Sequence, residues 1–150
     1  MEKYEKGDLG SALADYTRAI DLDPKSAVAY YNRGLLKKAK GDLDGALADY
    51  TRAIEFDPKN AKAYVSRGFL QQAKGYLDGA LADYTRAIEL DPKDAKAYTN
   101  RGLVKQTKGD LDGALGDYTR AIELDPKDVL ACYNRGILKK DRGDLDGALA

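Results

Sequence analysis

The chain has 150 residues, in which 25 lysines and arginines balance 25 aspartates and glutamates. A net charge of zero without a basic run argues against nucleic acid and anionic membranes as partners. No apolar stretch approaches the roughly 18 residues that a membrane helix needs, and the charged start lacks an apolar targeting segment, so we expect a cytoplasmic protein.

One stretch, Lys40 to Lys59, organises the sequence. It reads KGDLDGALADYTRAIEFDPK, has near-copies from Lys6, Lys74 and Lys108, and begins again at Arg142, always 34 residues apart. A fixed period of this length is typical of stacked units, each of which buries its apolar face against the next. We therefore predict one continuous domain over 1–150. It consists of a leading fragment, three whole repeats and a trailing fragment: 1–26, 27–60, 61–94, 95–128 and 129–150.

Each whole repeat is predicted to contain two helices. The first helix opens after a capping side chain and ends at a glycine. The capping residues are Ser26, Asn60, Asp94 and Asp128, and the glycines are Gly41, Gly75 and Gly109. The second helix has an aspartate in its first turn, where a negative charge complements the helix dipole, and a proline after its end. These residues are Asp44, Asp78 and Asp112, followed by Pro58, Pro92 and Pro126.

The apolar residues of the second helix share one face, at three- and four-residue spacing. They are Ala46, Leu47, Tyr50, Ala53 and Ile54 in the repeat 27–60. In the first helix a recurring glycine predicts close approach of the two helices, since it has no side chain to separate them. It stands at Gly34, Gly68, Gly102 and Gly136. The glycines at Gly45, Gly79 and Gly113 are not explained by helical periodicity, because alanine there would favour the helix by about 0.5–1 kcal/mol.

These residues resemble the tetratricopeptide repeat (TPR) family. The residues of 27–60 that match the family pattern are Tyr30, Gly34, Ala46, Tyr50, Ala53 and Pro58. The resemblance covers the whole chain and implies an all-α fold, a right-handed superhelical α-solenoid of antiparallel helix pairs. The sequence departs from the pattern at two places, where the family usually has Leu and Tyr. The first holds Arg33, Arg67, Arg101 and Arg135, and the second holds Lys37, Gln71, Lys105 and Lys139. We predict that the arginines pair with aspartates of the second helix, such as Asp49, Asp83 or Asp117.

The resemblance also implies a peptide-binding surface, on the concave side that the first helices line. The implied residues are Tyr31, Asn32, Leu35, Lys62, Val65, Phe69, Lys96, Asn100, Leu103, Asn134 and Ile137. An apolar stripe within this set suits the anchors of an extended peptide. The stripe is Leu35, Phe69, Leu103 and Ile137. The asparagines resemble a ladder with which some family members hold a peptide backbone, although Ser66 interrupts it. Alternatively, they bond to water or within the stack.

Catalytic and metal chemistry is not expected. Without histidine and with one cysteine, the chain lacks most nucleophile and metal constellations. Cys132 takes the place of Tyr30 and Tyr64, which predicts a small core residue rather than a reactive thiol. The repeated GDLDG favours helix capping over calcium, since it lacks the spacing and closing glutamate of an EF-hand loop. We predict no enzyme, no catalytic residue, no cofactor and no metal.

The predicted function is a protein-protein interaction scaffold with a protein or peptide as partner. The clamp with which some family members hold a chaperone tail is not expected, because only Asn32 and Lys62 fit its spacing and Ser66 stands where its arginine belongs. A second interpretation remains open. The chain could be a structural segment, natural or designed, that stacks head to tail into a homo-oligomer, because solenoids generally need polar capping repeats and neither end shows one.

Overall fold

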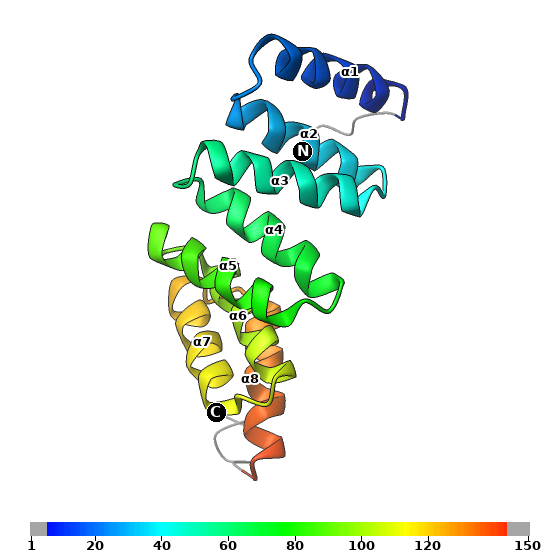
Figure 1. Ribbon diagram of the computed structural model, residues 1–150. Helices are drawn as coiled ribbons and strands as arrows, with labels where there is room; N and C mark the ends of the chain where they lie inside the picture. The colour runs from blue at the N-terminus through cyan, green and yellow to red at the C-terminus, as the bar shows by residue number, and fades with distance from the viewer. Residues whose placement is uncertain (1–5, 144–150) are drawn as a thin grey trace.

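The computed structural model describes residues 6–143 and, within them, folds into helices without a strand (Figure 1). In chain order the helices are α1 (Lys6–Leu22), α2 (Ala27–Ala39), α3 (Leu43–Phe56), α4 (Ala61–Ala73), α5 (Leu77–Leu90), α6 (Ala95–Thr107), α7 (Leu111–Leu124) and α8 (Val129–Asp141). The predicted all-α class is confirmed. The end of the predicted trailing fragment, 144–150, and the start of the leading fragment, 1–5, lie outside the described residues. No helix within 6–143 is both long and apolar enough to cross a membrane.

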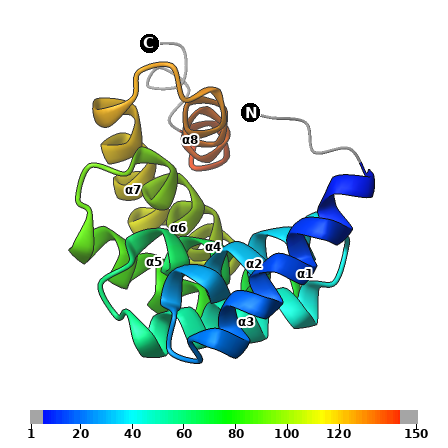
Figure 2. The ribbon, with the colours of Figure 1, turned by 90° about the horizontal axis from the view of Figure 1, so that it is seen from above.

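The helices stack in sequence order. Within the repeats, α2 packs on α3, α4 on α5 and α6 on α7, and each pair packs on the next through α3 with α4 and α5 with α6. The helix α1 packs on α2, and α8 packs on α7. Seen from above, the array curves so that α2, α4, α6 and α8 lie toward the inside and α3, α5 and α7 lie outside (Figure 2). The solenoid therefore presents its first helices on the concave side.

The predicted helix boundaries are confirmed by cap geometry. The side chains of Ser26, Asn60, Asp94 and Asp128 each accept a hydrogen bond from the backbone N–H three residues on. At the other end, Gly41 has φ +85° and Gly109 has φ +88°, a left-handed conformation that side chains with a Cβ rarely adopt. Each first helix therefore ends where glycine allows the chain to turn into the second.

Glycine also permits the close approach predicted between paired helices. Tyr50, Tyr84 and Tyr118 are fully buried. A Cβ added to Gly34 would lie 2.7 Å from Cε1 of Tyr50, and one on Gly102 would lie 2.7 Å from Cε1 of Tyr118. Contacts this short are sterically forbidden, so these glycines let the tyrosine ring lie directly on the facing helix.

Two of the three glycines that periodicity left unexplained, Gly45 and Gly113, now have a physical account. The Asp42 carboxylate caps α3 by accepting from the backbone N–H of Gly45 at 2.9 Å. A Cβ on Gly45 would lie 2.7 Å from Cγ of that same aspartate. Asp110 and Gly113 repeat the arrangement at α7. Glycine therefore makes room for the capping carboxylate, a contact that helical spacing alone does not reveal.

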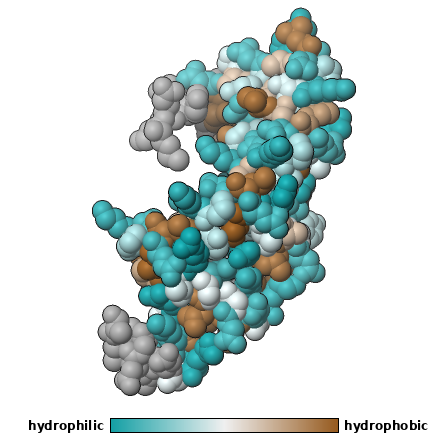
Figure 3. Space-filling model, turned by 90° about the vertical axis from the view of Figure 1, so that its left-hand side faces the viewer, coloured by the Kyte–Doolittle hydropathy of each residue, from teal (hydrophilic) through white to brown (hydrophobic). Residues whose placement is uncertain are grey.

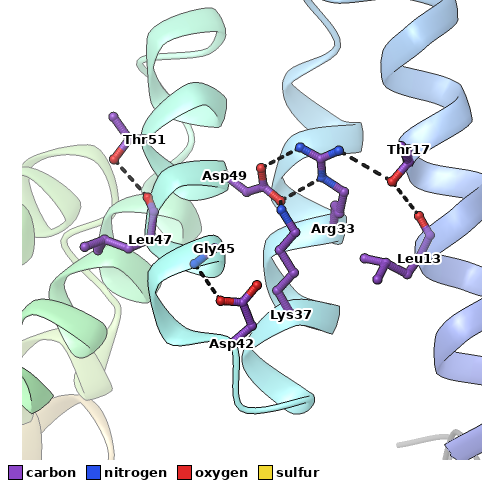
Figure 4. Close-up of polar contacts among 9 residues, drawn as sticks. All are labelled: Leu13, Thr17, Arg33, Lys37, Asp42, Gly45, Leu47, Asp49 and Thr51. Carbon is purple, nitrogen blue, oxygen red and sulfur yellow. Dashed lines mark hydrogen bonds and ion pairs between the residues drawn. The ribbon is translucent and has the colours of Figure 1, made fainter.

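The predicted arginine–aspartate pairing is confirmed in each whole repeat. Figure 4 shows Arg33 of α2 donating from Nε and Nη2 to the two oxygens of Asp49 in α3, both at 2.8 Å. Lys37 Nζ lies 3.0 Å from Oδ2 of the same aspartate, which is 3% exposed. Arg33 Nη1 also reaches Thr17 of α1 at 3.5 Å. The buried charge therefore links three successive helices. The same bonds join Arg67 to Asp83 and Thr51, and Arg101 to Asp117 and Thr85.

The prediction that Cys132 is a core residue is wrong, since its side chain is exposed. Its counterpart Tyr30 is buried between Ile20 of the preceding helix and Ala53 and Phe56 of the following one. Within the described residues no helix follows α8, so only one side of the corresponding site is built. The position that is buried at Tyr30 is therefore exposed at Cys132.

Candidate functional site

All the predicted groove residues lie on α2, α4, α6 and α8, the helices of the concave side. Some also belong to the core. Tyr31 is half-buried, and its ring centroid lies 5.8 Å from that of Tyr50. Val65 packs beside the buried rings of Tyr64 and Tyr84, and Leu103 packs against the cluster around Tyr118. Contact between these three residues and a ligand stays a prediction. The structure shows that each of them also packs against core residues.

Leu35 and Phe69 are the exposed apolar residues of the predicted stripe, at 39% and 46% exposure. Lys38 Nζ lies 4.5 Å from the ring centroid of Phe69, within reach of a cation–π interaction. The lysine comes from α2 and the ring from α4, so this contact joins two repeats on the inner side. Ile137 is half-buried. The exposed apolar area of the stripe is therefore larger on α2 and α4 than on α6.

The predicted asparagines differ in burial. Asn32 and Asn100 are half-buried, as is Ser66, which stands at the corresponding position of α4. Asn134 is 9% exposed, and its Nδ2 has no hydrogen-bond partner among the described residues. The amides therefore form a discontinuous row along α2, α6 and α8.

A hollow of about 450 Å³ lies where α6 meets the α7–α8 connection. It is lined by Lys96, Thr99, Asn100, Asp125, Lys127, Asp128, Val129 and Leu130. Thr99 Oγ1 donates to Oδ2 of Asp128 at 2.6 Å, while Oδ1 of Asp128 accepts from the Ala131 backbone at 3.0 Å. The Asp125 carboxylate accepts from the Lys127 backbone at 3.0 Å. Both carboxylates therefore already accept hydrogen bonds from backbone or hydroxyl groups. By contrast, the side chains of Lys96 and Lys127 are exposed cations.

Sequence reasoning found Lys96 and Asn100 of this hollow and missed Lys127. The resemblance points only to first helices, and Lys127 lies in the connection before α8. One signal was present: Thr99, whose hydroxyl bonds to Asp128, stands where the preceding repeats have Tyr31 and Val65. Lys62 is exposed on α4 and does not line the hollow.

The other features of the described surface are a second hollow and scattered hydrophobic patches. Residues 6–143 contain no group of three or more histidines, cysteines or acidic residues that could hold a metal ion. The face shown in Figure 3 carries separate hydrophobic patches within a largely hydrophilic surface. Cys132 lines an open hollow of about 400 Å³ with Pro126, Lys127, Val129 and Tyr133.

Comparison with protein families gives matches along most of the chain. A model described as TPR repeat matches residues 2–41, 35–75 and 72–109, and one described as tetratricopeptide repeat matches residues 95–128. A search of curated protein sequences gives no significant match.

Solved structures with the same fold include several repeat proteins. The structure of MamA is 26% identical with a TM-score of 0.90, and the match covers 96% of this chain and 84% of that one. YrrB, described as a TPR protein with an unusual peptide-binding site, is 29% identical with a TM-score of 0.84, covering 95% of this chain and 74% of its own. The first TPR of Spaghetti (RPAP3), bound to the HSP90 peptide SRMEEVD, is 25% identical with a TM-score of 0.76, covering 81% of this chain and 96% of its own.

Proposed function

This chain belongs to the tetratricopeptide repeat family, and from that premise we propose that it binds an extended peptide along the concave side of α2, α4, α6 and α8. The fold and the similar structures support a protein-interaction scaffold. Two of those structures are described by a peptide-binding site or a bound peptide. The observation that carries the proposal is exposed apolar area, at Leu35 and Phe69, on the same side as the hollow at Lys96 and Asn100.

The chemistry of this side defines the ligand. Leu35 and Phe69 offer an apolar anchor site, and a partner residue placed there would lose its contact with water. Lys96 and Lys127 favour an acidic side chain at the hollow, and the Asn100 amide can both donate to and accept from a peptide group. We therefore infer a ligand segment that carries one apolar and one acidic residue. Binding to it, rather than catalysis, is the proposed activity.

The proposal is tested by selecting peptides from a random library and measuring their affinity by fluorescence anisotropy. Phe69→Ala and Asn100→Ala should each weaken a selected peptide by about tenfold, since truncating a contact residue commonly costs 1 kcal/mol or more. Tyr76→Ala serves as the control, because Tyr76 is an exposed aromatic residue that lies outside the groove. Selected peptides that bind equally well to all three variants would overturn the proposed site.

A second candidate function is self-association into a head-to-tail array. The observation that favours it is the apolar surface of α8, where Val129 is 79% exposed and Tyr133 is 67% exposed. Exposed apolar patches mark interaction surfaces. The test is the mass of the protein by light scattering over a wide concentration range, at low and moderate salt. A mass that rises with concentration supports self-association, and a mass fixed at 16.4 kDa overturns it.

A further inference from the structure

The hollow beside α6 contains two lysines that have no ion-pair partner in the described part of the chain. Lys96 of α6 and Lys127 of the α7–α8 connection both line the hollow, and both are exposed. Within residues 6–143 neither ammonium group forms an ion pair. At the other end of α6, by contrast, Lys108 donates to Asp78. The two cations of the hollow are therefore available to a ligand.

The two aspartates of the hollow are held by hydrogen bonds within the chain. Asp128 accepts from Oγ1 of Thr99 at 2.6 Å and from the backbone N–H of Ala131 at 3.0 Å. Asp125 accepts from the backbone N–H of Lys127 at 3.0 Å. An ammonium group carries three donors and forms its strongest hydrogen bonds with an ionised acceptor. A carboxylate supplied by a ligand therefore matches the lysines of the hollow in charge and in hydrogen bonding.

The exposed aromatic ring of Phe69 lies on the neighbouring inner helix. Phe69 is the ninth residue of α4, Lys96 is the second residue of α6, and the two helices are in contact. The difference in helix position corresponds to about 10 Å along the axis, and packed helices lie about 8–10 Å apart. Because the hollow extends from α6 toward α8, the ring and the hollow are roughly 15 Å apart. An extended chain covers this distance with about four or five residues.

We propose that this groove selects a peptide segment in which an acidic side chain stands about four or five residues from an apolar one. The apolar side chain packs on Phe69, and the acidic side chain enters the hollow, where Lys96 and Lys127 bind its carboxylate. This inference rests on the proposed function. It adds the spacing of the ligand residues and a specificity-determining residue, Lys127, that lies outside the inner helices.

The first test removes the two charges of the hollow. Peptides selected from a random library are synthesised with a C-terminal amide, so that only side chains carry carboxylates. Replacing the acidic residue of such a peptide by its amide should weaken binding to the wild-type protein by about fivefold at low salt. On the double variant Lys96→Gln/Lys127→Gln the same replacement should change the affinity by less than about twofold, because the partners of the carboxylate are gone.

The matched control is the double variant Lys59→Gln/Lys93→Gln. These two lysines occupy, in the α3–α4 and α5–α6 connections, the place of Lys127 in the α7–α8 connection. Both are exposed and neither lines the hollow. The control loses the same charge as the test variant, so it should keep the fivefold effect of the acidic residue.

The second test moves the acidic residue along the same peptide while the apolar residue stays in place. The benefit of the acidic residue over its amide should be largest at a separation of about four or five residues. It should be absent at a separation of one or two residues, because that length of chain spans at most about 7 Å. The affinities are measured by fluorescence anisotropy.

Failure of this inference differs from failure of the proposed function. Peptides that depend on Phe69 and Asn100 but bind equally well with the acid or its amide overturn the acidic site, while groove binding stands. An acid effect that the Lys59 and Lys93 control also abolishes, or that persists at the short separation, overturns it as well. A library that yields no peptide dependent on Phe69 or Asn100 overturns both.

Discussion

At the scale of single residues, the buried aspartates set this chain apart from an array with an all-apolar interface. Asp83 lies between α4 and α5 and is held by two nitrogens of Arg67, at 2.7 and 2.8 Å. A carboxylate can be buried at little net cost only when its oxygens keep such donors. Removing either partner therefore leaves the other as a desolvated, unpaired charge.

We predict strong coupling in a double-mutant cycle of Arg67→Ala and Asp83→Ala, measured by urea unfolding. The coupling energy should be about 1–3 kcal/mol, as for contacting residues of one hydrogen-bonded network. The control cycle uses Arg86 and Glu89, an exposed ion pair within α5 at 3.0 Å, and should show no measurable coupling. Equal coupling in the two cycles would mean that burial adds nothing to the Arg67 pair.

The buried tyrosines predict a loss of stability at alkaline pH. Burial raises the pKa of Tyr50 and of Tyr118 from 10.0 to about 12. Between these values the unfolded chain is ionised while the folded one stays neutral, so the free energy of unfolding falls as pH rises above about 10. Tyr50→Phe should remove its share of this loss, as measured by urea unfolding at pH 7 to 11.5.

The same variant is informative at neutral pH. The Tyr50 hydroxyl has no hydrogen-bond partner among the described residues, whereas the Tyr84 hydroxyl donates to Gln72 at 2.8 Å. Tyr50→Phe should therefore be nearly neutral at pH 7, and Tyr84→Phe should cost about 1 kcal/mol. If Tyr50→Phe lowered the free energy of unfolding as much as Tyr84→Phe does, the Tyr50 hydroxyl would have to make a hydrogen bond as stabilising as that between Tyr84 and Gln72.

At the scale of helices, α5 differs from its counterparts α3 and α7 at its N-cap, the residue just before the helix. Asp42 and Asp110 cap α3 and α7, but Tyr76 stands at the corresponding position and makes no capping bond. Beside it, a Cβ on Gly79 would meet the Gln71 amide at 3.1 Å instead of a capping carboxylate. The first turn of α5 therefore lacks the side-chain capping bond that α3 and α7 have.

Tyr76→Asp should stabilise the protein by about 1 kcal/mol, the usual worth of an N-cap side chain. Little packing is lost, because Tyr76 is exposed. The reverse change, Asp110→Tyr in α7, should destabilise it by a similar amount. Both stability changes are measured by thermal or urea unfolding. If Tyr76→Asp were no more stable than wild type, the absence of a capping bond would not be what limits the stability of α5.

Helix bounds and helix pairing could be predicted from sequence because their causes are local. A capping side chain, a left-handed glycine and a period of 34 residues specify them without knowledge of the curvature. Arg33 and Asp49 could be paired because each recurs at a fixed place in the repeat. The hollow could not be found, since Lys127 and Asn100 come together only through the angle between successive repeats. The exposure of Cys132 was missed because a packing position needs helices on both sides.

At the scale of the whole molecule, each helix depends on its neighbours and on little else. Among the described residues, the interior helices α4 and α5 pack on a helix at either side, while α1 packs chiefly on α2 and α8 on α7. In a stack with nearest-neighbour energetics, opening begins where a helix has a single neighbour. Amide hydrogen exchange should therefore be slowest in α4 and α5 and faster in α1 and α8.

This gradient also responds to association between copies. At low concentration we expect the gradient as stated, and equal protection of α1 and α4 there would contradict nearest-neighbour stability. At high concentration, association through the exposed apolar surface of α8 should slow the exchange of α8, while that of α4 changes little. The pattern of protection thus reports which surfaces meet, because each helix is stabilised only by what lies directly against it.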